Sequence, residues 1–295
     1  MKLIPYITLF RPKSWIKNLF VFSPLFFSLN LFHKAALLYS LEGFIIFCML
    51  SSAIYIFNDI ADIQKDRIHP RKKFRPLAAG KISITSAAIV MGLLLITAGI
   101  LTLLILPVKF RIVAGAYFIL NIFYTVTGKK INLVEILLLS SNLVIRVVAG
   151  STAIGVYTSE WIIIVTFFVA LMLTFIKRKS ELIILGEQAE KHRHVLKYYT
   201  VSILDKLIYI SATVTICSYM LYTINDRVTE IFHTNKLIYS VIFVVAGIFR
   251  FIQLSENNNY DNEGDPTILI LKDNFLKIAI ILWLLYILSV IYFHL

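Results

Sequence analysis

The residues best suited to chemistry lie in one acidic segment that follows an apolar run over 44–57. The segment has an N-D-x-x-D-x-x-x-D pattern from Asn58 to Asp66. On a helix of about 100° per residue, Asp59, Asp62 and Asp66 fall within roughly 60° of one another, with Asn58 at the edge of that arc. Oxygen ligands of this kind suit Mg²⁺ that is shared with substrate phosphates. The pattern predicts Asn58 and the three aspartates as metal ligands, with the aspartates as the catalytic residues.

The alternative interpretation is a polar helix end that emerges from a membrane. Stacked acids at a lipid boundary are costly and usually functional. The metal site is therefore the favoured interpretation.

Basic side chains follow the acidic segment on a long connection expected over about 63–85. Pro70 and Pro76 restrict its backbone, so the basic groups lie on a partly stiffened loop. Such groups beside an acidic metal site suit a ligand with several phosphates, because the metal neutralises one part and the cations the rest. The alternative is that these charges only orient the loop at a membrane surface. The candidates for ligand contact are Arg67, Lys72 and Arg75.

A second long connection is expected over about 177–206, after an apolar segment at 161–176. It begins with Lys177, Arg178 and Glu181, which are predicted to bind substrate. Lys177 and Arg178 lie four and three residues before Glu181, so an ion pair within one helix is the alternative.

Arg146 lies near the middle of the apolar segment 134–154, one helical turn after Asn142. An arginine at that depth in a membrane must face the bundle interior or a wet cavity, and it marks a substrate path by default. Tyr124 belongs to a polar stripe on the preceding apolar segment. Arg146, Asn142 and Tyr124 are therefore substrate-binding candidates. The alternative is that Arg146 holds helices together through Asn121 or backbone carbonyls.

The composition indicates a membrane protein. Hydrophobic residues make up 59% of the 295 residues and charged residues 16%, and the mean hydropathy is +0.81. A soluble domain of this length cannot bury so much apolar surface, whereas spanning helices expose it to lipid. We expect an all-α, polytopic helical bundle with about nine spans, eight or ten being the alternatives. The segments are 19–32, 37–57, 86–106, 112–127, 134–154, 161–176, 207–224, 237–254 and 274–293.

The net charge of +12 is explained by orientation in the membrane and not by nucleic acid. With the N-terminus inside, most of the 29 Lys and Arg residues fall in inner segments, as the positive-inside rule requires. The outer segments carry only Lys34, Lys109, Arg111, Arg227 and Lys236. This distribution predicts a cytoplasmic N-terminus, an outer C-terminus and an aspartate cluster on the cytoplasmic side. The segment 19–32 lacks a small-x-small cleavage site and is expected to remain as a span.

The sequence does not indicate a disulfide framework, a zinc site or a common nucleotide-binding or hydrolase motif. Cys48 and Cys217 lie in expected spans without metal-like spacing, and the six histidines are scattered. No Gly-rich phosphate loop, G-x-S-x-G or H-E-x-x-H pattern occurs. The chain is expected to form a single domain over 1–295, with cytoplasmic cap loops at about 63–85 and 177–206.

These motifs together resemble the UbiA superfamily of intramembrane prenyltransferases, and more closely its decaprenyl-phosphate phosphoribosyltransferase branch. The acidic pattern carries the resemblance, together with motifs spread over nearly the whole chain. These are Arg11-Pro12-x-x-Trp15-x-Lys17-Asn18, Asp66-Arg67-x-His69-Pro70, Phe74-Arg75-Pro76, Arg146-x-x-Ala149-Gly150, Lys177-Arg178-x-x-Glu181 and Gly264-Asp265-Pro266. The resemblance adds Lys17, Asn18 and His69 to the expected substrate-binding residues.

The resemblance implies a Mg²⁺-dependent transfer of a 5-phosphoribosyl group from phosphoribosyl pyrophosphate to a polyprenyl phosphate lipid. It also implies a multi-pass protein of a bacterial inner membrane with its active site on the cytoplasmic side. A homo-oligomer is left open. Aromatic prenyltransferases of this fold carry a second Asp-rich motif near the end of the sixth span, where this sequence has Lys177, Arg178 and Glu181. Two cations there suit direct contact with a phosphate.

Two other functions stay open at this stage. The first is transfer of an isoprenoid from a prenyl diphosphate to an aromatic acceptor on the same fold. The second is a lipid or solute transporter without enzymatic activity. A transporter would be expected to show interrupted helices and polar groups at mid-membrane in paired halves, whereas most acids here lie at one face.

Overall fold

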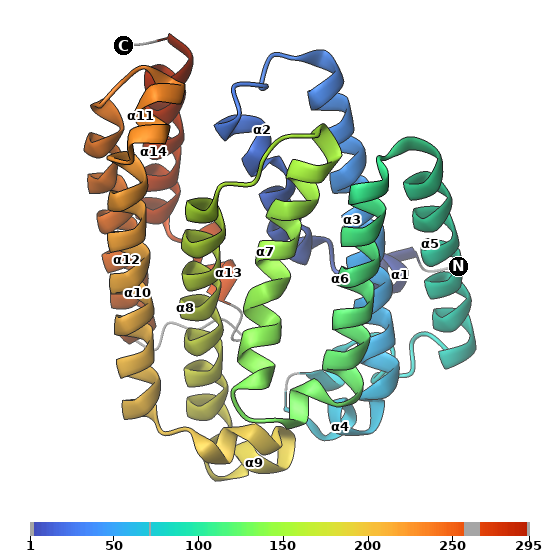
Figure 1. Cartoon of the computed structure of the whole chain (residues 1–295). Helices are drawn as coiled ribbons and strands as arrows, with labels where there is room; N and C mark the ends of the chain where they lie inside the picture. The colour runs from blue at the N-terminus through green and yellow to red at the C-terminus, as the bar shows by residue number, and fades with distance from the viewer. Residues whose placement is uncertain (1–2, 71, 257–265, 294–295) are drawn as a thin grey trace. The chain divides into compact units, whose positions relative to one another are not determined.

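The chain is helical throughout the part that the structure describes. The structure is a computed structural model and describes residues 3–70, 72–256 and 266–293. Within these ranges it contains α and 3₁₀ helices and no β strand (Figure 1). The prediction of an all-α bundle is confirmed.

The helices form two compact units, Met1–Thr158 and Ser159–Leu295. The first unit contains α1 (Leu3–Phe10), η1 (Pro12–Phe22, a 3₁₀ helix), α2 (Ser23–Phe27), α3 (Lys34–Ala61), α4 (Ile63–Ile68), η2 (Lys72–Phe74), α5 (Ile84–Ile105), α6 (Val108–Val126), η3 (Gly128–Lys130) and α7 (Val134–Ile154). The second contains α8 (Glu160–Leu185), η4 (Gly186–Gln188), α9 (Ala189–His192), η5 (His194–Tyr198), α10 (Val201–Thr223), α11 (Asp226–Phe232), η6 (Lys236–Ser240), α12 (Val241–Glu256), α13 (Pro266–Lys272) and α14 (Asn274–Phe293). The single domain over 1–295 stays a prediction.

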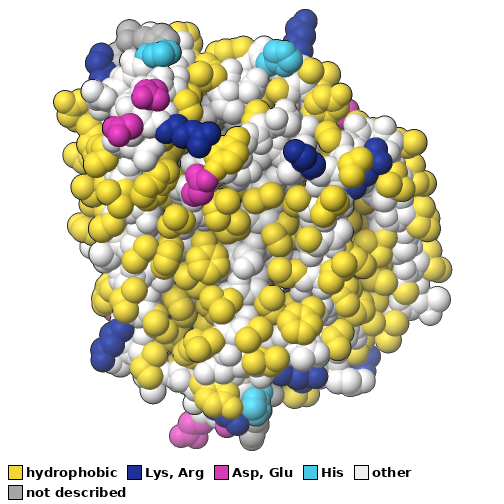
Figure 2. All heavy atoms as spheres, viewed as in Figure 1, with side chains coloured by type: hydrophobic (Ala, Val, Ile, Leu, Met, Phe, Trp, Pro, Cys, Tyr) yellow, Lys and Arg dark blue, Asp and Glu magenta, His cyan; other side chains and the backbone are white. Residues whose placement is uncertain are grey.

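Eight helical segments in the described ranges are long and apolar enough to cross a membrane. In each unit, hydrophobic side chains cover the middle of the helices, whereas charged side chains gather toward the helix ends (Figure 2). The eight segments are α3, α5, α6, α7, α8 with η4, α10, η6 with α12, and α14. The chain is therefore an integral membrane protein.

The segment 19–32 differs from its prediction as a ninth span. Its helical part consists of the end of η1, followed directly by α2, and it ends at Phe27, so 19–32 is not one continuous helix. The number of nine spans stays a prediction. Asn30 donates its side-chain amide to the carbonyl oxygen of Ser28 at 2.8 Å, and Leu29 between them has a left-handed φ of 60°. Local side-chain to backbone bonds of this kind compete with helix formation. The chain turns there and enters α3 at Lys34.

The N-terminal segment packs closely against α3 and α7 through a small residue. A Cβ atom built on Gly150 of α7 would lie 2.0 Å from the carbonyl oxygen of Val21 in η1, so no other residue fits there without movement. Val21 belongs to an apolar core that also contains Phe47 of α3, Phe110 of α6 and Ala149 of α7. This packing fixes the end of η1 against α3, α6 and α7.

The acidic segment lies where α3 ends, and the helix is interrupted there. Asp62 caps α3 with φ −103° and ψ 10°, which is not helical, and α4 begins at Ile63. α4 ends before His69, whose backbone is extended with ψ 133°. His69 precedes Pro70, and the residue before a proline is disfavoured in the helical region. Asp59 therefore lies on α3, Asp62 at the break and Asp66 on α4, so the three aspartates do not share one continuous helix face.

Candidate functional site

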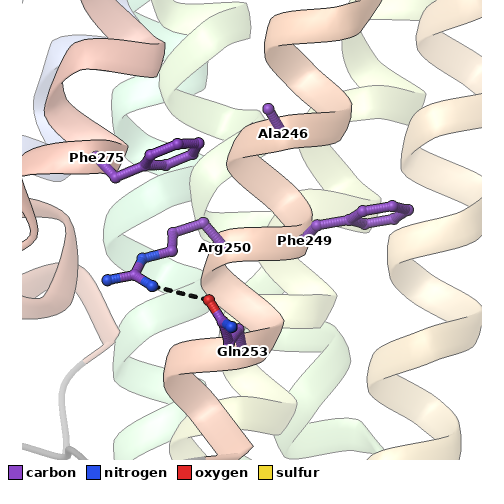
Figure 3. A pocket seen from close by; sticks show the side chains of 5 residues that line it. All are labelled: Ala246, Phe249, Arg250, Gln253 and Phe275. Atoms are coloured by element: carbon purple, nitrogen blue, oxygen red, sulfur yellow. Dashed lines mark hydrogen bonds between the residues drawn. The ribbon is translucent and has the colours of Figure 1, made fainter.

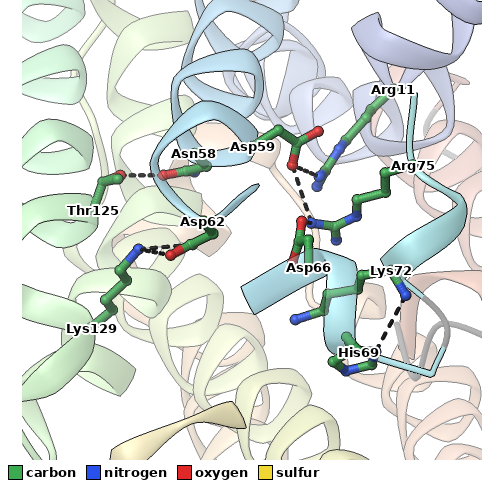
Figure 4. Close-up of polar contacts among 10 residues, drawn as sticks. All are labelled: Arg11, Asn58, Asp59, Asp62, Asp66, His69, Lys72, Arg75, Thr125 and Lys129. Carbon is green, nitrogen blue, oxygen red and sulfur yellow. Dashed lines mark hydrogen bonds and ion pairs between the residues drawn. The ribbon is translucent and has the colours of Figure 1, made fainter. Parts of the chain in front are cut away.

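Asp59 and Asp66 lie together at the end of α3 and on α4, and both are almost fully buried. Nη1 of Arg75 lies 3.1 Å from Oδ1 of Asp59 and 2.7 Å from Oδ2 of Asp66 (Figure 4). Nη2 of Arg11 also donates to Oδ1 of Asp59. One guanidinium thus bridges two carboxylates, and a second shares an oxygen with it. The pairing of Asp59 and Asp66 in space agrees with their predicted place in one site.

Asp62 and Asn58 point elsewhere. Both carboxylate oxygens of Asp62 accept from Nζ of Lys129, at 2.7 and 2.8 Å, beyond the end of α6. Oδ1 of Asn58 accepts from the hydroxyl of Thr125 on α6. The break in the helix at Asp62 explains why this carboxylate does not converge with the other two. Among the described residues, no group of three or more His, Cys, Asp or Glu side chains is arranged to hold a metal ion.

The donor set nevertheless fits a divalent cation at two of the predicted ligands. One oxygen of Asp59 and one of Asp66 both contact Nη1 of Arg75, so the guanidinium group occupies the position between the two carboxylates. Carboxylate oxygens are ligands that Mg²⁺ accepts, usually through one or two carboxylates. Burial raises the pKa of Asp66, although the positive charges of Arg75 and Lys72 oppose this shift. A metal ion here would replace the bridging contacts of Arg75.

The remaining basic candidates of the first loop surround this pair in different ways. His69 is buried, and its Nδ1 accepts the backbone N–H of Lys72 at 3.2 Å. The side chain of Lys72 is half-buried, whereas Arg67 is exposed on α4. The structure therefore brings Arg75 and Lys72 to the acid pair, whereas the His69 side chain contacts the backbone of Lys72 and Arg67 is exposed on α4.

Arg146 lies in a closed polar network inside the first unit. Its Nε donates to Oδ1 of Asn18 at 2.7 Å, its Nη1 to the carbonyl oxygen of Asn142 at 2.6 Å, and its Nη2 to the hydroxyl of Tyr117 at 2.9 Å. The side-chain amide of Asn121 donates to Oδ1 of Asn142 at 2.6 Å. All five residues are buried. These contacts join η1, α6 and α7, as the structural alternative for Arg146 requires.

The other substrate-binding candidates of the first unit are dispersed. Lys17 is half-buried on η1, one residue before Asn18. Asn18 donates to Sγ of Cys48 and to the hydroxyl of Ser51, which ties it to α3. Tyr124 is buried near the end of α6. Their assignment to substrate stays a prediction.

Arg178 on α8 is fully buried in the second unit, and Nη1 contacts Oε2 of Glu181 at 2.5 Å. Nε of Arg193 lies 3.6 Å from the same oxygen. Lys177 is half-buried. The ion pair within one helix, which was the alternative interpretation, is therefore present for Arg178 and Glu181.

Lys179 of α8, which is not among the predicted site residues, joins three helices of the second unit. The buried ammonium lies 2.6 Å from Oδ1 of Asp205 on α10 and 3.0 Å from Oε1 of Glu256 on α12. The hydroxyl of Tyr209 donates to Glu256 at 3.3 Å. This cluster balances the buried charge of Lys179 at the ends of these helices.

A shallow cavity of about 400 Å³ lies on the second unit. Nη2 of Arg250 contacts Asp273 at 2.7 Å, and Nη1 donates to Gln253 at 2.8 Å. Arg250 also lies against the ring of Phe275, with 6.0 Å from Cζ to the centroid. The cavity is lined by Ala246, Phe249, Arg250, Gln253 and Phe275 (Figure 3). The predicted motif residues Gly264 and Asp265 lie outside the described residues.

Two cations of the acidic site were not among the predicted site residues. Arg11 belongs only to a motif of the resemblance, and Lys129 is one of the Lys and Arg residues that the positive-inside rule assigns to inner segments. Both are distant from the aspartates in sequence, so helical spacing could not connect them. The available signal was charge balance, because three acids at a membrane boundary require cationic partners.

The chain is similar in sequence to known proteins. The chain is 29% identical to the decaprenyl-phosphate phosphoribosyltransferase of Corynebacterium glutamicum, across 96% of this chain and 85% of that protein. It is 30% identical to the protein of the same name from Mycolicibacterium smegmatis, across 96% of this chain and 91% of that protein.

Solved structures share the fold. A UbiA homolog from Archaeoglobus fulgidus bound to GPP and Mg²⁺ has a TM-score of 0.71 at 18% identity, covering 97% of this chain and 99% of that one. The family model of the UbiA prenyltransferase family matches residues 20–264, which include the acid pair, its bridging Arg75, and Arg146. The chain belongs to the UbiA prenyltransferase family.

Proposed function

We propose that this protein transfers a 5-phosphoribosyl group from phosphoribosyl pyrophosphate to the phosphate of a polyprenyl lipid of the decaprenyl type. The observation that carries the proposal is the mixed cluster, in which Asp59 and Asp66 converge on one nitrogen of Arg75. Such a cluster offers carboxylates to a metal and guanidinium groups to phosphates. The similarity to two decaprenyl-phosphate phosphoribosyltransferases over nearly the whole chain supports this choice of substrates.

The reaction has a simple bond balance. A phosphate oxygen of the lipid forms a bond to the anomeric carbon of the ribosyl donor. The bond from that carbon to the diphosphate oxygen breaks, and the diphosphate leaves with the electron pair. The nucleophile is already anionic, so the site needs no strong base. Direct displacement gives inversion at the anomeric carbon.

The site residues act mainly by position and charge. Arg75 and Lys72 lie beside the acid pair, and His69 contacts the backbone of Lys72. These three residues are suited to hold donor phosphates in a fixed orientation. Asp59 and Asp66 would hold Mg²⁺, which neutralises charge on the departing diphosphate when it is bound. Asn58 and Asp62 lie next to these ligands but are engaged with Thr125 and Lys129. Their part in metal binding requires that they exchange these partners.

The positive-inside distribution supports a site on the cytoplasmic face of a bacterial inner membrane. Phosphoribosyl pyrophosphate is water-soluble and would reach the site from that side. The polyprenyl chain would stay in the bilayer, with its phosphate at the level of the helix ends. Lys177, half-buried in the C-terminal third of α8, is a further candidate for a phosphate contact.

The test is an assay of purified protein in detergent with ribose-labelled phosphoribosyl pyrophosphate, a polyprenyl phosphate and Mg²⁺. The expected result is label that becomes extractable into organic solvent and depends on all three additions. A parallel reaction contains a prenyl diphosphate and 4-hydroxybenzoate. Prenylation of the aromatic acid without any ribose transfer would overturn the proposal in favour of the aromatic prenyltransferase function.

A further inference from the structure

The acidic site is charge-balanced by the protein itself. Oδ1 of Asp59 accepts from Arg11 and from Arg75, and Arg75 also contacts Asp66 (Figure 4). Two carboxylates thus meet two guanidinium groups. A divalent cation that binds these carboxylates must displace charge-assisted hydrogen bonds, which are about twice as strong as neutral ones.

Arg11 reaches Asp59 because of an unusual backbone position. It separates α1 from η1 with φ 53° and ψ 58°, the left-handed region that non-glycine residues rarely adopt. Its guanidinium lies over the ring of Tyr55 on α3, with 5.0 Å from Cζ to the centroid. The side chain is 24% exposed, whereas that of Asp59 is 3% exposed. Arg11 therefore has solvent access that the carboxylate it covers lacks.

The displaced cations would need new partners. A guanidinium released from a carboxylate beside the site would find equivalent charge-assisted bonds in a diphosphate, whose oxygens suit its planar fork. Solvent exposure of 24% for Arg11 and 29% for Arg75 gives both groups a path to such a ligand. A metal ion alone offers them no replacement.

We propose that Arg11 is a diphosphate-binding residue that covers Asp59 in the free protein and exchanges it for diphosphate when a divalent cation enters. The inference rests on the proposed function only in taking Asp59 and Asp66 as metal ligands. Metal and diphosphate then bind with positive coupling, because the metal displaces Arg11 from Asp59 and the diphosphate gives Arg11 a new partner. Such coupling is reciprocal and typically about 5–150-fold in affinity.

The coupling is specific to the Arg11 side of the cluster. Lys129 contacts both oxygens of Asp62 and lies beyond the end of α6, apart from the oxygen that Arg11 and Arg75 share. Arg111, near the other end of α6, donates its Nε to the carbonyl oxygen of Leu106 at 3.0 Å. Arg111→Ala therefore removes an arginine of the same unit without touching the acid pair, and it is the matched control.

The experiment is equilibrium dialysis of the full-length protein in detergent against Mn²⁺, with or without inorganic diphosphate. The Mn²⁺–diphosphate complex in solution is included in the fit. In the unaltered protein and in Arg111→Ala, diphosphate should tighten Mn²⁺ binding by about tenfold or more. In Arg11→Ala, Mn²⁺ alone should bind at least about threefold tighter, because a competitor is gone, and the gain from diphosphate should largely disappear.

Two further arms keep the proposal falsifiable. Arg11→Lys keeps the charge without the fork, so it should bind Mn²⁺ alone like the unaltered protein but show a reduced gain from diphosphate. Inorganic monophosphate should give a smaller gain than diphosphate in the unaltered protein. An Arg11→Ala protein that melts normally but binds Mn²⁺ no tighter, or that keeps the full gain, would overturn the proposal. An equal gain from monophosphate would overturn the assignment to diphosphate.

These measurements need no ribosyl transfer, so they separate the two proposals. Coupling without lipid labelling would contradict the proposed function and leave the role of Arg11 intact. Lipid labelling without coupling would contradict the role of Arg11 alone. Weaker Mn²⁺ binding in Arg11→Ala, both with and without diphosphate, would assign Arg11 to the scaffold and overturn the proposal.

Discussion

The acid pair at the end of α3 and the Arg146 network both hold charges inside the first unit, but their partners differ. Asp59 and Asp66 meet Arg11 and Arg75, whose side chains are 24% and 29% exposed. Arg146 is 4% exposed and meets only neutral oxygens, those of Asn18, Tyr117 and the Asn142 backbone. The first group can exchange partners with solvent and ligands, whereas the second donates three hydrogen bonds to buried partners inside the protein.

We interpret the acid pair as part of a binding site and the Arg146 network as a structural one. Partly exposed ion pairs contribute little to stability, because water screens them and can replace them. A buried charge that loses its hydrogen bonds is costly, because no solvent compensates it. We therefore expect changes at the acid pair to affect binding and catalysis first, and changes at Arg146 to affect stability first.

The largest effect is expected at the acid pair. Asp59→Asn and Asp66→Asn should each lower ribosyl transfer by at least about a hundredfold, as loss of a preorganised charge contact typically does. Asp62→Asn should lower it less, because Asp62 is directed to Lys129. Initial rates in the lipid-extraction assay, with melting temperatures as the control for folding, give the comparison. Equal losses at all three positions would mean that Asp62 joins the site when ligand is bound.

The next effect is expected in the stability of the Arg146→Ala protein. Loss of hydrogen bonds to a charged group should lower the free energy of unfolding by about 1.5–3 kcal/mol. Thermal melting in detergent measures this, and Arg111→Ala serves as the control. A protein that melts normally but has lost ribosyl transfer would instead place Arg146 in a substrate cavity.

A smaller effect on catalysis is expected for Arg178→Ala. Arg178 is fully buried against Glu181, so its removal takes away the shorter of the two cation contacts of this carboxylate, leaves the longer one to Arg193, and should lower the melting temperature. The KM for phosphoribosyl pyrophosphate should change only a few-fold, within about 1 kcal/mol. Lys177→Ala, the neighbouring change, should raise KM more if Lys177 contacts phosphate. A rise of tenfold or more for Arg178→Ala at normal stability would make Arg178 a phosphate ligand.

The smallest effect is expected at the Arg250–Asp273 pair of the second unit. The Arg250 guanidinium donates to Asp273 and lowers the pKa of that carboxyl. A lowered native pKa gives stability that is present above the ordinary Asp pKa and is lost as the pH falls through the native pKa. Asp273→Asn should therefore melt slightly below the unaltered protein at pH 7, and the difference should vanish in acid. A constant difference across that range would contradict the ion pair.

Sequence reasoning located the acid pair because spacing along one helix carries information about nearby residues. It placed Asp62 with Asp59 and Asp66 by assuming an unbroken helix, and the non-helical turn at Asp62 separates them. The apolar segments predicted eight helices well, since their length and composition suffice. The segment 19–32 has similar composition, but local bonds at Ser28 and Asn30 stop its helix.

Contacts between distant segments could not be predicted in this way. Arg11 lies 48 residues before Asp59, and Lys129 lies 67 residues after Asp62. Arg146 was recognised as a charge that needs partners, but its contact with Asn18 spans 128 residues. Depth in the membrane indicated that a partner was necessary, and only the fold identifies which residue supplies it.

The most direct test uses phosphoribosyl pyrophosphate that carries one label in the ribose and another in the β-phosphate. It is incubated with the protein, a polyprenyl phosphate and Mg²⁺. We expect the ribose label to become lipid-extractable while the β-phosphate label stays in water as diphosphate. Asp59→Asn should abolish both the transfer of the ribose label and the release of diphosphate. Lipid that carries both labels or neither, or transfer that persists in Asp59→Asn or after metal chelation, would contradict the account.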